Sequence, residues 1–411
     1  MTLRGAVREW FVAIASVMLL TLGACGAPEP RDGEALPWSE LQEHGWPRGA
    51  VAVVGLDSYF DAANPSGFLA ILFRNGGVRY LTIGPGGGLP SNVAGTTCFA
   101  SQDVTYRVDG ESGQRWRRDG LQRAIDWLGQ VDGQCVVVTN EGMLSNGYEM
   151  NVHFGGPGEQ SKCVVNRFPG PVATYGSRIY LADQDRRTIK AHTCDLETGQ
   201  SLSTGFTRRA WQGNRDDYPK VASWSTEERP YHSYRGRLWG LETVRAKEWS
   251  GAEHEFRPGK RAMMRLAEIN PDADTYRSHL LGYSPNGWFE PAADSYQASL
   301  GLESGRRGGY FWRGGIYTFD TQNRLVRIDL DTARYRILGR SSQLAREGVG
   351  FAVGGYGDHL TVLAVGQSGR TVLEEYDLSN GGVRNTITVN DSLREFVNSN
   401  ELLFTGLAPL R

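Results

Sequence analysis

The hydrophobic positions of the chain fall in short runs that are apolar throughout or alternate with polar positions. Clear examples lie at 68–73, 135–139, 176–182, 236–241, 314–319 and 357–365. Because successive side chains of a β-strand point to opposite faces, runs of this length and period are typical of strands. A helical period is visible only around Leu121–Leu128, where we expect a short helix. The pattern predicts a chain that is almost entirely β.

A turn sequence that begins with Asp or Asn recurs along the chain. The acid or amide stands at Asp109, Asp195, Asn270, Asp329 and Asp377. In each copy this side chain can accept hydrogen bonds from the backbone that follows it, and most copies continue with a residue suited to positive φ. Each copy therefore predicts a tight turn at which one strand ends and its partner begins.

A second turn, led by glycine or polar residues, opens an apolar strand before the last four of these copies. Strand, turn, strand, Asp turn and strand form the skeleton of a four-stranded propeller blade once an innermost strand is added. Two less complete units, with strands at 68–73 and 135–139, bring the number of units to seven. The alternatives are a pair of β-sandwiches or a solenoid. Because radial closure leaves only short, protected strand edges, we predict an all-β fold, a seven-bladed β-propeller spanning 36–411 with long aromatic-rich loop insertions.

A propeller must be fastened where the two ends of its chain meet. The apolar C-terminal run Leu402–Leu407 is suited to pair with the first unit, whose strands start near Val51. We expect this pairing to close the ring, because an unpaired strand would leave its backbone groups exposed.

The repeat around Asp109 carries a family resemblance. The stretch from Val108 to Trp116 and, less fully, the stretch from Asp195 to Leu202 resemble the repeat of the pyrroloquinoline-quinone-like propeller family. That family includes quinoprotein dehydrogenases and a periplasmic lipoprotein of the outer-membrane assembly machinery. The terminal Trp of the repeat is kept only at Trp116, and the family usually has more blades than the seven units found here. The resemblance implies a propeller fold and leaves the function open.

The N-terminus has the layout of an export signal. Arg4 and Arg8 precede an apolar run from Trp10 to Leu22, which is too short to cross a bilayer comfortably. The run ends in Leu22-Gly23-Ala24-Cys25, which resembles the lipobox of bacterial lipoproteins. The alternative is an ordinary signal peptide with a cysteine at this place by chance. We predict a lipoprotein signal peptide at 1–24, lipidation of Cys25 and a flexible tether at 25–35. The protein would then be exported and lipid-anchored to a membrane, facing the periplasm or the cell exterior.

Four cysteines follow the lipidation site, at Cys98, Cys135, Cys163 and Cys194. An even number of cysteines in an oxidising compartment favours disulfides, although four cysteines permit three pairings. We favour Cys98 with Cys135 and Cys163 with Cys194, because each pair would join neighbouring repeat units. The alternative is four reduced, buried thiols. The absence of a Cys-x-x-Cys spacing argues against zinc.

The net charge and the absence of common sequence motifs argue against several classes of function. The chain has 44 Lys and Arg against 46 Asp and Glu, a net charge of -2, so it lacks the basic excess of a nucleic-acid-binding protein. The common hydrolase motifs are absent, and the glycine-rich run at 84–88 lacks the Lys-Ser/Thr of a phosphate loop. Calcium is conceivable at the carboxylate pairs Asp183/Asp185 and Asp272/Asp274, but turns favour Asp in any case. We therefore predict no catalytic, cofactor-binding or metal-binding residue.

The segment from Thr207 to Trp312 contains long insertions rich in aromatic residues and arginine. Insertions in propellers map to loops on one face, and Tyr, Trp and Arg are the residues that anchor interfaces, while flat aromatic rings also stack on sugars. The predicted interface residues are Trp211, Tyr218, Trp224, Tyr231, Trp288 and Phe289. The alternative is that these rings pack the loops against the blades.

The sequence thus predicts an extracytoplasmic, lipid-anchored binding or scaffold module whose partners are the membrane, through the lipid, and a protein or glycan. The alternative function is a propeller enzyme that acts on an extracytoplasmic glycan or small metabolite in the central channel. An enzyme requires carboxylates or histidines that converge on the inner strands. A passive structural lipoprotein is the third possibility.

Overall fold

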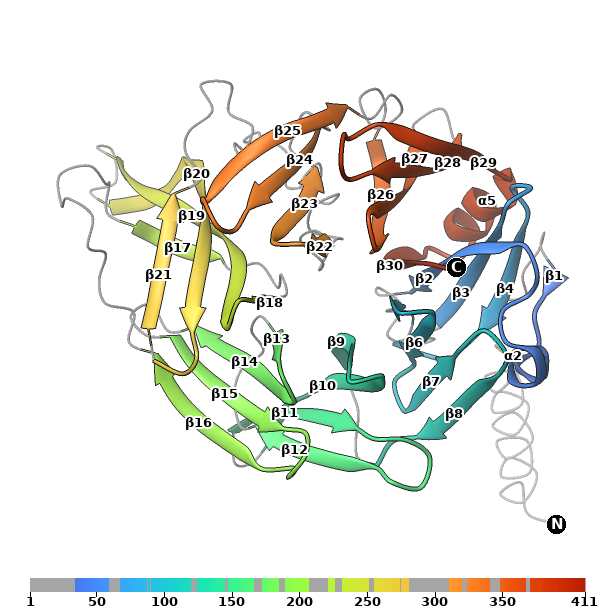
Figure 1. Cartoon of the computed structure of the whole chain (residues 1–411), viewed down its shortest axis with the longest axis horizontal. Coiled ribbons are helices and arrows are strands. Elements are labelled where there is room, and N and C mark those ends of the chain that lie inside the picture. Colours follow the sequence, from blue (N-terminus) through green and yellow to red (C-terminus); the bar gives the residue numbers. More distant parts are fainter. Residues whose placement is uncertain are drawn as a thin grey trace, which may run out of the picture.

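The structure is a computed structural model in which seven β-sheets are arranged in a ring (Figure 1). It describes residues 34–58, 67–86, 88, 90–119, 124–144, 147–165, 172–184, 189–206, 221–225, 231–250, 255–273, 275–280, 310–319, 324–340, 348–366 and 370–410. The protein is a seven-bladed β-propeller, as the repeat predicted.

The blades follow one another along the chain. The first contains β1 (Glu34–Ala35), β2 (Ala50–Asp57), β3 (Gly67–Phe73), β4 (Val78–Thr82) and, from the C-terminus, β30 (Leu403–Pro409). The second contains β5 (Ser91–Val93), β6 (Thr96–Ala100), β7 (Val104–Val108) and β8 (Gly113–Arg117). The third contains β9 (Ala124–Val131), β10 (Gln134–Leu144), β11 (Gly147–Phe154) and β12 (Ser161–Val165). The fourth contains β13 (Val172–Tyr175), β14 (Arg178–Gln184), β15 (Ile189–Asp195) and β16 (Ser201–Phe206).

The remaining three blades come from the second half of the chain. The fifth contains β17 (Val221–Ser225), β18 (His232–Tyr234), β19 (Arg237–Ser250), β20 (Glu255–Asn270) and β21 (Thr275–Leu280). The sixth contains β22 (Tyr310–Trp312), β23 (Gly315–Phe319), β24 (Arg324–Asp329) and β25 (Arg334–Arg340). The seventh contains β26 (Gly348–Tyr356), β27 (His359–Gly366), β28 (Thr371–Asp377) and β29 (Val383–Val389).

The C-terminal strand closes the ring as predicted. β30 pairs antiparallel with β2, with Leu407 opposite Val54 and Gly406 opposite Gly55. It occupies the innermost position of the first blade, so that this blade is built from both ends of the described chain (Figure 1). The closing strand reaches Pro409, two residues beyond the predicted end.

All five predicted Asp turns are present, and each joins the third and fourth strands of a blade. The side-chain Oδ1 accepts a backbone N–H two or three residues later at each of Asp109, Asp195, Asn270, Asp329 and Asp377. Because neighbouring strands are antiparallel, the turns between first and second strands lie at the same end of the blades as these Asp turns. We call this end of the ring the Asp-turn face.

The hydrophobic core is divided into seven clusters, one between each pair of neighbouring blades. The cluster between the second and third blades, for example, contains Ala100, Ile125 and Val137 together with two cysteines. A blade buries its faces only against its neighbours, which is why the ring has to close.

One local prediction was wrong. Residues 121–128 were expected to form a short helix, but β9 begins at Ala124 and is the innermost strand of the third blade. Its register against β10 shifts by one residue, so that Ile125 and Leu128 both pack toward the second blade. A β-bulge inserts one extra residue and therefore produces the spacing of three that resembles a helical turn.

Two short helices that the strand pattern did not indicate lie against the ring. α2 (Trp38–His44) packs on the second blade through Trp38, and α5 (Asp391–Ser399) packs on the first blade, where Phe396 stacks on Tyr80 at 4.1 Å. None of the helices in the described ranges is long and apolar enough to span a membrane.

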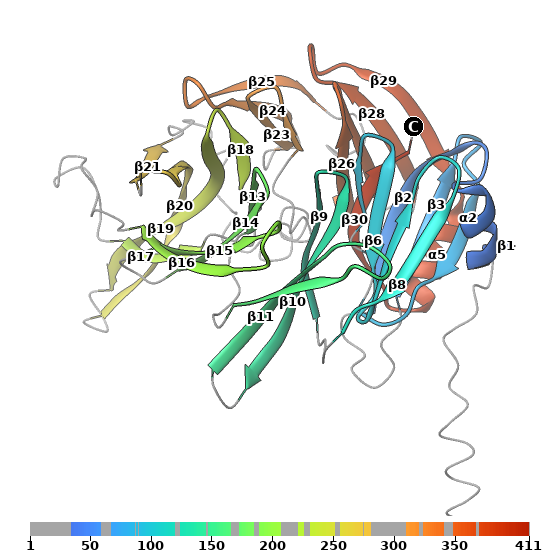
Figure 2. The same cartoon turned by 60° about the horizontal axis from the view of Figure 1, so that its bottom comes forward.

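Two hairpins extend beyond their blades on the face opposite the Asp turns. They are β10–β11 and β19–β20, with strands of up to 11 and 16 residues respectively. Figure 2 shows β10–β11 projecting from the body of the ring. The long β19 pairs with β18 near the Asp-turn face and with β17 farther along, so two short segments share the inner edge of the fifth blade.

Candidate functional site

A pocket of about 330 Å³ lies at the mouth of the central channel. All seven blades contribute to it through the innermost strand or the residue just before it: β5, β9, β13, β18, β22, β26 and β30. Each of these strands has one end at the Asp-turn face, and the lining residues lie mostly near that end. The pocket therefore opens on that face, away from the two long hairpins.

Aromatic rings form much of the pocket wall. They belong to Trp127, Tyr231, His232, Tyr310 and Phe311. The rings of His232 and Phe311 stack with their centroids 5.4 Å apart and their planes 17° apart. Burial lowers the pKa of His232 to about 4, so this imidazole is neutral near pH 7.

Two of these rings lie directly on glycine backbone. A Cβ added to Gly129 would fall 2.2 Å from the Trp127 ring, and one added to Gly355 would fall 2.2 Å from the Tyr310 ring. Any residue other than glycine at these places would displace the ring. The Tyr310 hydroxyl also donates to the Gly357 carbonyl at 3.0 Å, which fixes the direction of the side chain.

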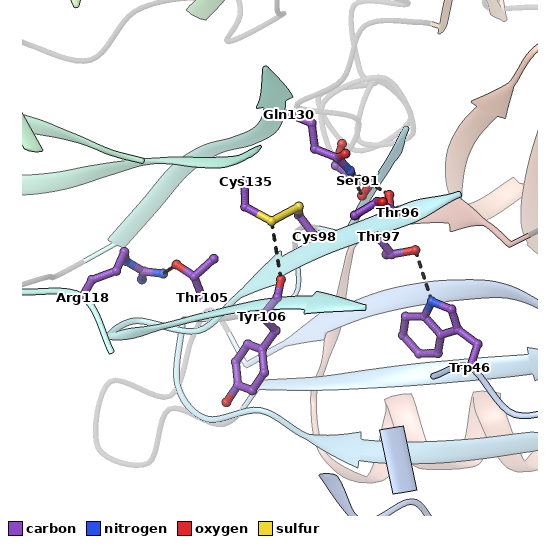
Figure 3. Close-up of a disulfide and its surroundings, with 10 residues drawn as sticks. All are labelled: Trp46, Ser91, Thr96, Thr97, Cys98, Thr105, Tyr106, Arg118, Gln130 and Cys135. Carbon is purple, nitrogen blue, oxygen red and sulfur yellow. Dashed lines mark hydrogen bonds between the residues drawn. A yellow bond between two sulfur atoms is a disulfide. The ribbon is translucent and has the colours of Figure 1, made fainter. Parts of the chain in front are cut away.

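Amide side chains tie the inner strands of the first three blades together around the mouth. Asn92 Nδ2 donates to the Pro409 carbonyl at 2.7 Å, which links the second blade to the closing strand. Gln130 Nε2 donates to the carbonyls of Ser91 and Thr96 at 3.0 and 2.8 Å, which links the third blade to the second (Figure 3). These bonds hold the wall in place before any ligand arrives.

Both predicted disulfides are present, and each joins neighbouring blades. Cys98 of β6 is bonded to Cys135 of β10, and Cys163 of β12 is bonded to Cys194 of β15. Figure 3 shows the first of them near Gln130 and Ser91. The third blade is thus cross-linked on both sides, and such disulfides are typical of proteins that fold in an oxidising compartment.

A second pocket, of about 350 Å³, lies between the fifth and sixth blades. In its wall the buried carboxylate of Glu268 pairs with Arg237 and with His279, whose Nε2 is 2.9 Å away. Desolvation, together with the charges of Arg277 and Arg237, lowers the pKa of His279. At the rim Arg235 pairs with Asp331 at 2.8 Å. The acidic and basic side chains of this pocket therefore pair with one another: Glu268 pairs within the fifth blade, and Arg235 pairs with Asp331 of the sixth blade.

The sequence did not identify Glu268 and His279 as neighbours. The register places Arg277 opposite Glu268, with His279 two residues farther along the same strand. Since side chains two apart share a strand face, the pairing could have been inferred only once the turn at Asn270 had fixed that register.

The predicted interface residues are placed only in part. Trp211, Tyr218, Trp288 and Phe289 lie outside the described residues, and Trp224 is placed only as a backbone position in β17. Tyr231 is buried between the fourth and fifth blades, where its backbone N–H donates to the Val172 carbonyl at 3.0 Å. Tyr231 is also among the residues that line the channel-mouth pocket.

The carboxylate pairs considered for calcium are also described in part. Asp272 accepts a hydrogen bond from the Tyr175 hydroxyl of the preceding blade at 3.2 Å. Its predicted partner Asp274, and Asp185 of the other pair, lie outside the described residues. Within the described part of the chain, no group of three or more His, Cys, Asp or Glu residues could hold a metal ion.

These features define a class of protein, a seven-bladed β-propeller with a pre-formed pocket at one mouth of its channel. No protein-family model and no curated protein matches the sequence. Solved structures match the fold: apo AztD from Citrobacter koseri (11% identity, TM-score 0.39, 83% of this chain and 96% of that chain), BamB from Moraxella catarrhalis (11%, 0.37, 73% and 87%) and a protein from Lactobacillus plantarum (9%, 0.42, 88% and 99%). At these identities the likeness is one of fold alone.

Proposed function

We propose that this protein is an extracytoplasmic, lipid-anchored binding module that takes a small ligand at the mouth of its central channel. The pocket built by all seven blades is the observation that carries the proposal. Its size is within the range of small-molecule sites, and its wall combines apolar and aromatic side chains with polar groups.

The rigidity of the wall supports a binding role. Backbone contacts at Gly129 and Gly355, together with the amide bonds of Asn92 and Gln130, hold the lining groups in one arrangement. A pre-formed site loses little conformational entropy when a ligand binds, which favours affinity. The predicted aromatic contact residues of the insertions would add a second surface, for a protein or glycan.

An enzyme acting in the channel has less support. Asp126 and His232 are the carboxylate and the imidazole that the described wall contains, and they lie on strands of the third and fifth blades with the fourth blade between them. General acid–base chemistry requires such groups within hydrogen-bond reach of the same substrate atom.

The predicted lipid anchor supplies the location. Cys25 follows an apolar segment and a small-residue site, and residues 25–35 are predicted to form a flexible tether, so the propeller would be held at a membrane surface. A Cys25→Ser variant is expected to move from the membrane fraction to the soluble fraction of the envelope or the medium. If the variant stayed in the membrane fraction, the anchor would have to be something other than lipid on Cys25.

The binding site is tested by filling it. Thr174 lines the pocket from β13, and Thr174→Trp should occupy it, whereas Val383→Trp places the same bulk on the outermost strand of the seventh blade, where Val383 is 42% exposed. Native mass spectrometry of protein purified from its own envelope is expected to detect a bound small molecule on the wild type and on Val383→Trp. Thr174→Trp should carry none. If the wild type and both variants all carry a bound small molecule, or if none of them does, the channel mouth is not the binding site.

A further inference from the structure

We infer that the ligand of the channel-mouth pocket is a neutral saccharide that stacks on the rings of Trp127 and Tyr310. This inference rests on the proposed function and adds the chemical class of the ligand. Three features of the wall support it, namely the placement of the two rings, the charge of the wall and the backbone edges of the inner strands.

The two rings form fixed platforms. Each has the backbone of Gly129 or Gly355 against it, and both residues are half-buried and line the pocket. Trp127 comes from the third blade and Tyr310 from the sixth. The carbon-bound hydrogens of a pyranose ring form an apolar face that packs on an aromatic face, and a rigid platform with few freely rotating bonds makes that contact at low entropic cost.

The charge of the wall favours a neutral ligand. Asp126 carries the one carboxyl group of the described wall, and the lowered pKa of His232 keeps its imidazole uncharged near pH 7. The chain has 44 Lys and Arg residues, yet none of them is among the described lining residues. Among the described lining residues, a phosphate, a nucleotide or an acidic sugar would find no cationic partner of the kind that such anions require.

The inner strands supply hydrogen bonds for hydroxyl groups. β5, β9, β22, β26 and β30 each pair with one neighbouring strand in the described sheets, so their other edge faces the channel. The Ser91 and Pro409 carbonyls already accept from Gln130 and Asn92, and the rest of this edge carries further backbone N–H and C=O groups. Such an edge offers donors and acceptors in alternation, which suits the hydroxyl group because it can donate and accept at the same time. A saccharide has an apolar face and a rim of hydroxyls, and therefore fits both the platforms and the edges.

Calorimetric titration with neutral mono- to tetrasaccharides of glucose, galactose, mannose and N-acetylglucosamine tests the inference. We expect one series to bind the wild type and to quench tryptophan fluorescence, and Trp127→Ala and Tyr310→Ala each to weaken binding by about tenfold or more. Trp127→Phe and Tyr310→Phe keep a ring on the glycine and should retain most of the affinity. Trp312→Ala is the matched control, because Trp312 is a half-buried tryptophan of the same strand as Tyr310 and lies outside the pocket wall.

The phenylalanine variants keep the test valid if an alanine variant fails to fold, which its melting curve would reveal. Binding of a saccharide that is unchanged in both alanine variants would overturn the stacking arrangement. Binding of tetramethylammonium or glucuronate, with none of the neutral saccharides, would overturn the ligand class. If none of these probes binds while Thr174→Trp still removes a natural small molecule, the saccharide inference fails and the channel mouth remains the binding site.

Discussion

His153 belongs to a buried polar cluster between the second and third blades. Its Nε2 lies 3.1 Å from Thr139 Oγ1, and Thr139 in turn donates to Glu141 Oε1 at 2.9 Å. Nearby, Arg118 is 3% exposed and donates to Thr105 Oγ1 at 2.6 Å. Burial, with the positive charges of Arg118 and Lys162, lowers the pKa of His153 to about 3. The imidazole is therefore neutral in the folded protein.

This shift predicts an acid sensitivity. Below a pH of about 6.5 the unfolded chain binds a proton at His153, whereas the folded chain stays unprotonated until about pH 3, so the free energy of unfolding falls by up to roughly 1.4 kcal/mol per pH unit as the pH decreases through this range. His153→Gln, which can still donate to Thr139, should make that decline shallower. Urea unfolding at several pH values between about 7 and 4 measures it.

The control for this experiment is His44→Gln, because the His44 side chain is 74% exposed. It should leave the pH dependence of the wild type unchanged. A decline that is equally steep in His153→Gln and in the wild type would show that the titration of His153 does not contribute.

At the scale of the element, the closing strand has the largest role because it completes the first blade and seals the ring. Burial increases along β30, from Leu403, which is 44% exposed, to Leu407, which is 4% exposed and packed in the cluster between the seventh and first blades. Pairing with β2 also satisfies backbone groups that a missing strand would leave open. The seven-bladed ring therefore depends on its last ten residues.

Deletion of residues 402–411 is expected to abolish the cooperative thermal unfolding transition of the whole propeller, because the first blade would lose its innermost strand and the ring its closure. Within the intact strand, Leu407→Asp should lower the free energy of unfolding by about 3 kcal/mol or more, since it buries a charge. Leu403→Asp, on the same strand but exposed, should cost about 0.5 kcal/mol or less. Scanning calorimetry measures all three, and a truncated protein with unchanged melting would contradict closure by β30.

At the scale of the whole molecule, covalent links join three consecutive blades. The two disulfides have sequence separations of 37 and 31 residues, and all four sulfur-bearing residues are buried at 2% exposure or less. They lie on the side of the ring from which Asn92 and Gln130 also bind across blade boundaries. The blades that carry much of the channel-mouth wall are thus the most heavily cross-linked part of the described chain.

Replacement of Cys98 and Cys135 by alanine, or of Cys163 and Cys194, should each lower the free energy of unfolding by about 2–4 kcal/mol, because an open loop of this length has more conformational freedom when unfolded. Thermal unfolding with and without dithiothreitol measures the effect, and reductant should not destabilise a variant that lacks both pairs. Alkylation of the denatured, unreduced protein followed by mass spectrometry provides an independent check. Labelling of all four cysteines without reduction would contradict the bonded state.

Rules that consider only neighbouring residues in the sequence were sufficient to predict the features that such neighbours form by themselves. The Asp turns could be predicted because the side chains of Asp109 or Asp377 bond to backbone only two or three residues away. The same rules failed at Ile125 and Leu128, where the shift in register between β9 and β10, a feature of the pairing with another strand, changed the spacing of buried residues. The burial of Tyr231 between two blades likewise could not be predicted from the local sequence pattern.

The sequence by itself determined the β-propeller, its seven units and the identity of the closing strand, because strand period, turn chemistry and repeat spacing can be recognised along the chain. Among three possible cysteine pairings it only favoured the two disulfides that the structure contains. It did not determine the candidate site. Asn92 and Pro409 are 317 positions apart and meet only at the channel mouth, and Trp127 and Tyr310 face one pocket from the third and sixth blades. Only closure of the ring brings seven inner strands to one place, so the tertiary structure alone decided where the candidate pocket lies.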